Sequence, residues 1–178
     1  MLKSVLSFAV VAAVAGSLAA PAFAQDQAKP PLSPPGQTTA KIGAATLTID
    51  YNRPSMRGRK IMGELVPFGK VWRTGANRAT HLKTDAGIRI GTLAVPAGTY
   101  TIYTLPGEKA WTLIINKQIG QWGTQYDQAQ DLGRVDLKVE ALPAAVEQFT
   151  MTLSCTGNTG SLTLEWENTR ASVAIEAK

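Results

Sequence analysis

Cysteine and histidine are the scarcest reactive residues of this sequence, which has one of each, Cys155 and His81. A structural zinc site usually takes four ligands from these two residue types, so a single pair cannot form one without carboxylates. We therefore expect neither a metal nor a cofactor. One cysteine also excludes a disulfide within the chain, so a packed core must hold the fold together.

The same scarcity limits the catalytic possibilities. A Ser–His–Asp triad would have to use His81, and no Gly-x-Ser-x-Gly motif supplies a nucleophile. Cys155 falls on the apolar side of the alternating segment 149–155, which predicts a buried, unreactive thiol. The segment from Asp127 to Asp131 lacks the alternating oxygen ligands and closing glutamate of a calcium loop, and we interpret it as a solvated acidic turn.

Long apolar runs are missing too, except near the N-terminus. Lys3 precedes an apolar run that starts near Val5 and leads to the motif Ala22-Phe23-Ala24. This order predicts a signal peptide over residues 1–24, cleaved after Ala24, and hence a periplasmic or secreted bacterial protein. The alternative is a membrane anchor, but serine and glycine interrupt the run, which is shorter than the roughly 20 residues of a span. After cleavage we expect no membrane span.

Helical periodicity is absent from the remainder, and alternation of apolar and polar residues takes its place. The pattern covers residues 46–51, 134–141, 149–155, 162–167 and 173–175, with a hairpin indicated by 99–105 and 111–116. About eight or nine short strands predict an all-β fold, a single-domain antiparallel β-sandwich, with a closed barrel as the alternative. Residues 25–36 are proline-rich and predict an extended tether, so that the single β domain spans residues 37–178.

One stretch, residues 52–79, has no strand pattern. Loops longer than about 12 to 15 residues are uncommon in compact domains and are usually functional or disordered. This one contains Ile61, Phe68 and Trp72 among several other large apolar residues, too many for a disordered tail. We expect it to pack on the sandwich as one long loop, either as a lid or as a structural brace.

Basic residues are concentrated in and just after this stretch. Residues 52–83 contain eight basic side chains and one acidic side chain, whereas residues 84–178 contain seven basic and ten acidic ones. Clustered positive charge attracts anions, while a dispersed excess mainly aids solubility. A solvated loop rich in lysine and arginine is the alternative interpretation.

Several motifs carry a family resemblance over nearly all of the chain after residue 24. They are YNRPS (51–55), GRKI (58–61), LVPFGKVWRTGAN (65–77), PAGTY (96–100), GQWG (120–123) and LEWENT (164–169). This set resembles the domain of unknown function 2911 family of secreted bacterial proteins. The resemblance implies a secreted single domain and no particular activity. An acidic residue is expected after Gly-Ala-Asn, and Arg78 in its place implies a more anionic ligand if the position shapes a pocket.

The run WRTGAN combines residues suited to anion binding. Arg73 has a planar fork of donors, Gly75 permits a positive φ, and Asn77 tolerates a left-handed turn. The same residues suit a tight turn in which Arg73 pairs with an internal carboxylate, Asp50 or Glu165, and we favour this structural role.

The four tryptophans divide into two pairs. Trp111 and Trp166 lie in alternating segments and are predicted to be core residues. Trp72 and Trp122 lie in loops, the latter in an amide-rich segment with Tyr126 that suits a sugar ring. We favour the alternative that both loop tryptophans pin their loops to the sandwich.

Three functions remain open, and the residues do not decide whether the chain is an enzyme. The first is a non-enzymatic binding module for an anionic or carbohydrate-like envelope ligand. Its candidate ligand-binding residues are Arg53, Arg59, Trp72, Arg73, Asn77, Arg78, His81, Trp122 and Tyr126.

The second is a hydrolase of envelope material, with His81 as the base and Asp127, Asp131 or Glu165 as its partner. Arg73 and Arg78 would then lower the pKa of His81. The third is a scaffold that docks another envelope protein. Nucleic acid is not an expected partner, because basic and aromatic residues are not interleaved on one strand face.

Overall fold

The computed structural model of the protein describes residues 30–178, so the predicted signal peptide and the first part of the predicted tether lie outside the described residues. Nine strands form the fold. They are β1 (Pro35–Ile42), β2 (Ala45–Asn52), β3 (Thr80–Thr84), β4 (Ile88–Ile90), β5 (Leu93–Val95), β6 (Gly98–Leu105), β7 (Trp111–Asn116), β8 (Asp131–Thr156) and β9 (Thr159–Ala177). The one helical element of residues 30–178 is a 3-10 turn, η1 (Gln128–Gln130). The all-β prediction is confirmed.

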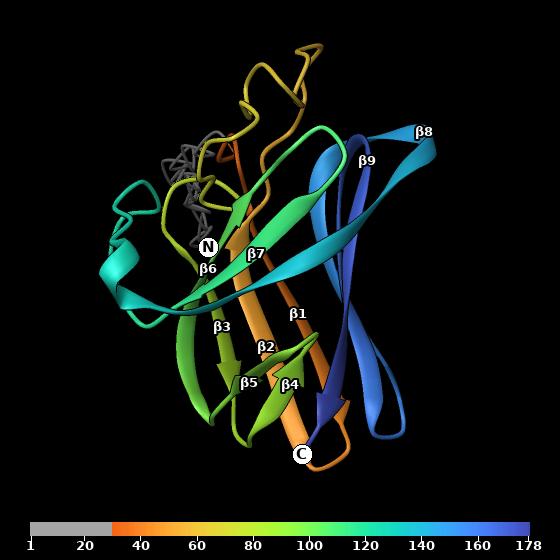
Figure 1. Cartoon of the computed structure of the whole chain (residues 1–178). Helices are drawn as coiled ribbons and strands as arrows, with labels where there is room; N and C mark the ends of the chain where they lie inside the picture. The colour runs from red at the N-terminus through yellow and green to blue at the C-terminus, as the bar shows by residue number, and fades with distance from the viewer. Residues whose placement is uncertain (1–29) are drawn as a thin grey trace, which may run out of the picture.

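The strands form a single antiparallel sheet in the order β1-β2-β3-β6-β7-β8-β9-β4-β5. β8 and β9 are much longer than the others, and their pairing shifts register between Ala141 and Thr150. Such irregularities bend a strand, and here they let the β8–β9 hairpin fold back toward β1, where the amide of Leu153 donates to Thr38 Oγ1. The sheet therefore folds into two layers without closing into a barrel (Figure 1).

Both layers contribute to one hydrophobic core, as the alternation predicts. In β2 the side chains of Leu47 and Ile49 are fully buried, while the intervening ones face outward. Trp111 and Trp166 are buried core residues as predicted. No helix in residues 30–178 has the length and apolar character that crossing a bilayer would need.

The prediction for Cys155 is wrong, because its thiol is exposed. The residue does share a strand face with buried Leu153, but it pairs with Gly160 close to the tip of the β8–β9 hairpin. Because its cross-strand partner is a glycine, no side chain from β9 covers the thiol at this position. Alternation along a strand predicts its faces and not where the core ends.

Residues 53–79, the β2–β3 connection, contain no strand, in agreement with the sequence. Figure 1 shows this segment beyond one end of the sheet, opposite the C-terminus. Its base is fixed: Ile61 and Val66 are buried, and the backbone of Trp72 exchanges two hydrogen bonds with Thr104 of β6. Glu167 of β9 adds a further tie, because its carboxylate accepts from the amides of Ile61 and Met62. The connection is thus anchored to both layers.

Candidate functional site

A cavity of about 520 Å³ lies where three segments meet: the β2–β3 connection, the residues just before β1, and the connection between β7 and β8. We call it the basic pocket. Its charged lining residues are Arg57, Arg59, Lys70 and Arg73. Its other large lining residues are Leu32, Leu65, Val66, Val71, Trp72, Tyr103, Tyr126 and Trp166. The volume falls in the usual range of small-molecule sites.

The lining contains four cationic side chains and no carboxylate. Within residues 30–178, none of the four forms an ion pair; the pairs there join other residues, such as Lys60 to Glu64 and Arg170 to Glu165. Cations gathered in a concave surface without ion-pair partners produce a positive potential that concentrates anions. The pocket therefore has the electrostatics of an anion site.

Backbone carbonyl groups hold the arginines in place without neutralising them. Arg59 donates from Nε to Met56 O (2.9 Å) and from Nη2 to Ser55 O (2.7 Å). Arg57 donates from Nη2 to Leu32 O (2.9 Å), which also fixes the segment before β1 against the connection. These bonds use part of each guanidinium group and leave its charge for other partners.

Arg73 does not form the ion pair that the sequence suggested, so that prediction is wrong. Its Nε donates to Gly75 O at 3.3 Å, within its own turn. Asp50 instead accepts from Gln37 (2.7 Å), and Glu165 accepts from Arg170 Nε (2.6 Å). The side chain of Arg73 lies against Gly123 of the β7–β8 connection, where an added Cβ would come within 2.7 Å of Arg73 Cδ.

The turn that presents Arg73 has the predicted conformational features. Thr74 and Asn77 have φ of 53° and 59°, and Gly75 has φ of 148°. Thr74 is buried, where its hydroxyl contacts Thr104 Oγ1 at 3.1 Å. This anchoring on β6 places Arg73 and Asn77 at the pocket while the turn itself stays fixed.

Aromatic rings form the floor of the pocket, but most of their surface packs in the core. Trp72 stacks on Trp166 with ring centroids 5.8 Å apart and an interplanar angle of 19°. It also meets Phe149 edge-on at 5.0 Å. Trp166 is only 2% exposed and its Nε1 donates to Glu147 O. Trp72 therefore pins the connection to the sandwich, as favoured from the sequence.

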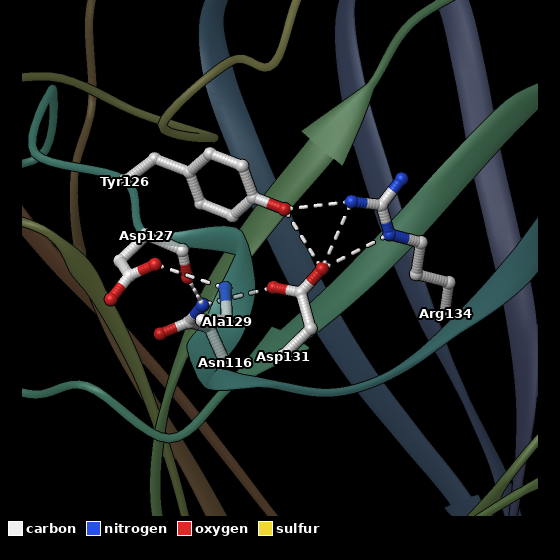
Figure 2. Close-up of polar contacts among 6 residues, drawn as sticks. All are labelled: Asn116, Tyr126, Asp127, Ala129, Asp131 and Arg134. Carbon is white, nitrogen blue, oxygen red and sulfur yellow. Dashed lines mark hydrogen bonds and ion pairs between the residues drawn. The ribbon is translucent and has the colours of Figure 1, made fainter.

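Tyr126 closes one side of the pocket through a polar network that Figure 2 shows. Its hydroxyl donates to Asp131 Oδ2 (2.8 Å) and accepts from Arg134 Nη2 (2.7 Å). Asp131 also accepts from Arg134 Nε (3.0 Å) and Asn116 Nδ2 (2.9 Å). Burial, followed by the hydrogen bond to Asp131, raises the pKa of Tyr126 to about 12, so the phenol stays protonated.

The interpretation of residues 127–131 as a solvated acidic turn needs correction for Asp131. Its carboxylate is engaged by three side chains and is half-buried, so it organises the β7–β8 connection. Asp127 remains exposed and caps η1, since its Oδ1 accepts from Ala129 N at 2.9 Å (Figure 2). Residues 30–178 contain no group of three His, Cys, Asp or Glu side chains arranged to hold a metal ion.

The predicted ligand-binding residues separate into two groups. The structure brings Arg59, Trp72, Arg73, Asn77 and Tyr126 together at the basic pocket.

The other four lie elsewhere. Arg53 donates to Phe149 O (3.3 Å) and Thr150 Oγ1 (2.9 Å), a bracing role between β2 and β8. Arg78 is exposed and its backbone bridges to Trp122, which is 51% exposed. Trp122 is thus not packed over the sandwich as favoured from the sequence.

His81 also lies outside the pocket, on β3. Its Nε2 accepts from Gly120 N at 3.4 Å. Burial lowers the pKa of His81, with nearby Asp50 acting in the opposite direction. The lowered pKa of His81 agrees with the prediction. The predicted cause, the positive charges of Arg73 and Arg78, is wrong.

None of the proposed carboxylate partners reaches His81. Asp131 is engaged by Tyr126, Asn116 and Arg134, Glu165 pairs with Arg170, and Asp127 caps η1. The acid–base pair of the hydrolase hypothesis is therefore not assembled among residues 30–178.

Sequence reasoning missed Arg57 and Lys70 at the pocket, together with the aliphatic residues Leu32, Leu65 and Val71. Lys70 was detectable, because it lies inside the motif that carries Trp72 and Arg73. Leu32 gave no signal, since a leucine in a proline-rich segment has no periodic context that would place it beside a distant loop.

A family model described as "Protein of unknown function (DUF2911)" matches residues 33–175, almost the entire described part of the chain. The chain belongs to the DUF2911 family. Searches of curated proteins and of solved structures gave no match for this DUF2911 protein.

Proposed function

We propose that this DUF2911 protein is a non-enzymatic binding module that takes a small anionic ligand into the basic pocket. The observation that carries the proposal is the set of four cations without a carboxylate among the lining residues. Arginine side chains recognise carboxylate and phosphate groups through charge-assisted hydrogen bonds, which are stronger than neutral ones. All four cations are candidate contacts in this proposal, because none of them is paired with a carboxylate of residues 30–178.

A carbohydrate ligand has less support than an anion. Sugar rings stack on exposed aromatic faces, and the exposed ring of this region, Trp122, is not among the lining residues. The rings that do line the pocket include Trp166 and Tyr103, which are almost fully buried. A hydrolytic role has less support as well, because His81 lies outside the pocket and forms no ion pair with a carboxylate of residues 30–178.

The proposal includes a location. The N-terminal pattern of Lys3, the apolar run and Ala22-Phe23-Ala24 supports export, so we propose that the module acts in the periplasm or outside the cell. Small anions in that setting include phosphorylated, sulfated and carboxylated compounds.

A thermal-shift and calorimetric screen of the chain from Gln25 onward tests the proposal. The probes are inorganic phosphate, sulfate and citrate at constant ionic strength. A ligand at about 100 times its Kd stabilises the folded state by about 2.7 kcal/mol, which raises the Tm of a domain of this size by roughly 5–10 °C. We expect at least one anion to give such a shift.

Two variants locate the effect. Arg73→Gln should remove most of the ligand-induced shift, because it deletes a cation at the pocket. Lys83→Gln is the matched control: it makes the same charge change on β3, in an exposed residue outside the lining. Equal loss of binding in both variants would indicate general charge attraction and contradict the proposal, as would the absence of any shift.

A further inference from the structure

The outer rim of the basic pocket is aliphatic. Leu32, Leu65 and Val71 are 64%, 46% and 38% exposed, and all three line the cavity. Single exposed apolar side chains are ordinary on a protein surface, but a group of them around one cavity marks an interaction site. The other exposed large apolar residues of 30–178 are Phe68, between Leu65 and Val71 in the chain, and Ile119 and Trp122, which are not lining residues.

The rim is held in position. Gly63 N donates to Val66 O (3.0 Å), which closes a turn around Leu65, and Gly69 N donates to Pro106 O (2.8 Å) just before Val71. In the segment before β1, the carbonyl of Leu32 accepts from Arg57. The aliphatic side chains thus project from fixed backbone, and a fixed apolar surface costs less ordering when it binds a ligand.

Cations and exposed apolar side chains line the same cavity. Lys70 immediately precedes Val71, and Arg57 is bonded to the residue that carries the Leu32 side chain. A fully hydrated anion would use the cations alone and leave the rim in water. A neutral lipid would cover the rim and leave the cations without a counter-charge.

We propose that the ligand is an anionic amphiphile, with a phosphate or carboxylate head on Arg57, Lys70 and Arg73 and an aliphatic chain against Leu32, Leu65 and Val71. This inference rests on the proposed function, because it assigns the ligand class of the same pocket. A free alkyl phosphate and the head of an anionic phospholipid share this chemistry.

The chain-length dependence of binding tests the inference. Isothermal titration calorimetry on the chain from Gln25 onward compares inorganic phosphate with ethyl, butyl and octyl phosphate, all as monomers. Each buried methylene is expected to strengthen binding about three- to fourfold until the rim is covered. Octanol, which has the chain without the head, should bind far more weakly than octyl phosphate.

Variants of the rim give the matched comparison. In the double variant Leu65→Ser, Val71→Ser the increase in affinity for each added methylene should be smaller, while the affinity for inorganic phosphate stays unchanged. Ile119→Ser, an exposed residue outside the lining, should leave the whole series unaltered. Melting curves check folding, and the series on the unmodified protein remains decisive if the double variant does not fold.

The outcomes separate this inference from the function it rests on. Equal affinities for phosphate and octyl phosphate would overturn the amphiphile and leave the anion pocket standing. No binding of any anion would overturn both, and octanol binding as tightly as octyl phosphate would overturn the role of the head group.

Vesicles of phosphatidylcholine with and without phosphatidylglycerol test whether the anionic group comes from a phospholipid head or from a free alkyl phosphate. Binding only to the anionic vesicles, weakened by the rim variant, supports the inference with a lipid head as ligand.

Discussion

Glu167 is the residue whose replacement most directly tests how the pocket is built. It lies on β9, and its two carboxylate oxygens accept from the amides of Ile61 (3.1 Å) and Met62 (2.9 Å) in the β2–β3 connection. Both donors belong to residues that are at most 9% exposed, so water cannot readily replace the lost acceptor. Glu167 itself has φ of 53°, a conformation that a non-glycine residue adopts only when its surroundings hold it there.

The magnitude follows from the two bonds. A hydrogen bond to a charged group contributes about 1.5–3 kcal/mol, which bounds the pair at about 3–6 kcal/mol. Glu167 is half-buried, and removing it also relieves its own desolvation, so we expect Glu167→Ala to cost about 2–4 kcal/mol. For a domain of this size that corresponds to a fall in Tm of roughly 5–15 °C. Glu167→Gln keeps one acceptor and should fall between Glu167→Ala and the parent.

Urea unfolding followed by circular dichroism measures these differences, with Glu176→Gln as the control on the same strand. Glu176 pairs with Arg89 at the surface, and exposed pairs contribute about 0–1 kcal/mol. If Glu167→Ala unfolds within about 0.5 kcal/mol of the parent, as surface substitutions do, the connection is not held by this carboxylate and our description of it as anchored is wrong.

Three further predictions concern single positions. Cys155 should react with a thiol reagent in the folded protein nearly as fast as in urea, because its side chain is exposed; protection in the native state would contradict the structure. Burial lowers the pKa of His81 from 6.5, so on acidification the unfolded chain takes up this proton first; the unfolding free energy should fall as the pH drops below about 6.5, and less steeply in His81→Gln. Gly123→Ala should cost about 1–3 kcal/mol and weaken phosphate binding, because the new Cβ would meet Arg73 Cδ and Asn77 O at 2.7 and 2.9 Å. Gly87→Ala, which meets only Lys178 at 3.9 Å, is its control, and equal costs at the two positions would contradict the close packing around Arg73.

Strands with one solvent-exposed face, such as β2, were predictable because buried residues recur there with a period of two, whereas β6 and β7 are buried on both faces. Leu47 and Ile49 of β2 illustrate this directly. What alternation cannot give is the extent of the core, and Cys155 shows the difference. Its face is apolar, yet its thiol is exposed near the hairpin tip, opposite a glycine that has no side chain to cover it.

The pocket was only partly predictable, for a different reason. Arg59, Trp72, Arg73, Asn77 and Tyr126 were named from motif chemistry, which reports what a side chain can do. Leu32 reaches the pocket through contacts between segments far apart in the chain, such as Arg57 to Leu32 and Asn52 to Ser33. No local pattern encodes such contacts, so the aliphatic rim and the full set of cations required the fold.

The excess of basic residues in 52–83 was visible in the composition. Whether it produces a positive surface depends on what the nearby acidic side chains bind. Glu167 binds backbone amides, Asp131 is held by Tyr126 and Arg134, and Glu147 Oε1 accepts from the backbone amide of Arg57. Within residues 30–178, none of these carboxylates forms an ion pair with a cation of the basic pocket; Glu167 and Glu147 instead hold the backbone of the β2–β3 connection. Because the acids fix the backbone while the cations keep their charges, the segment combines rigidity with a positive potential, and this combination is what a preformed anion site requires.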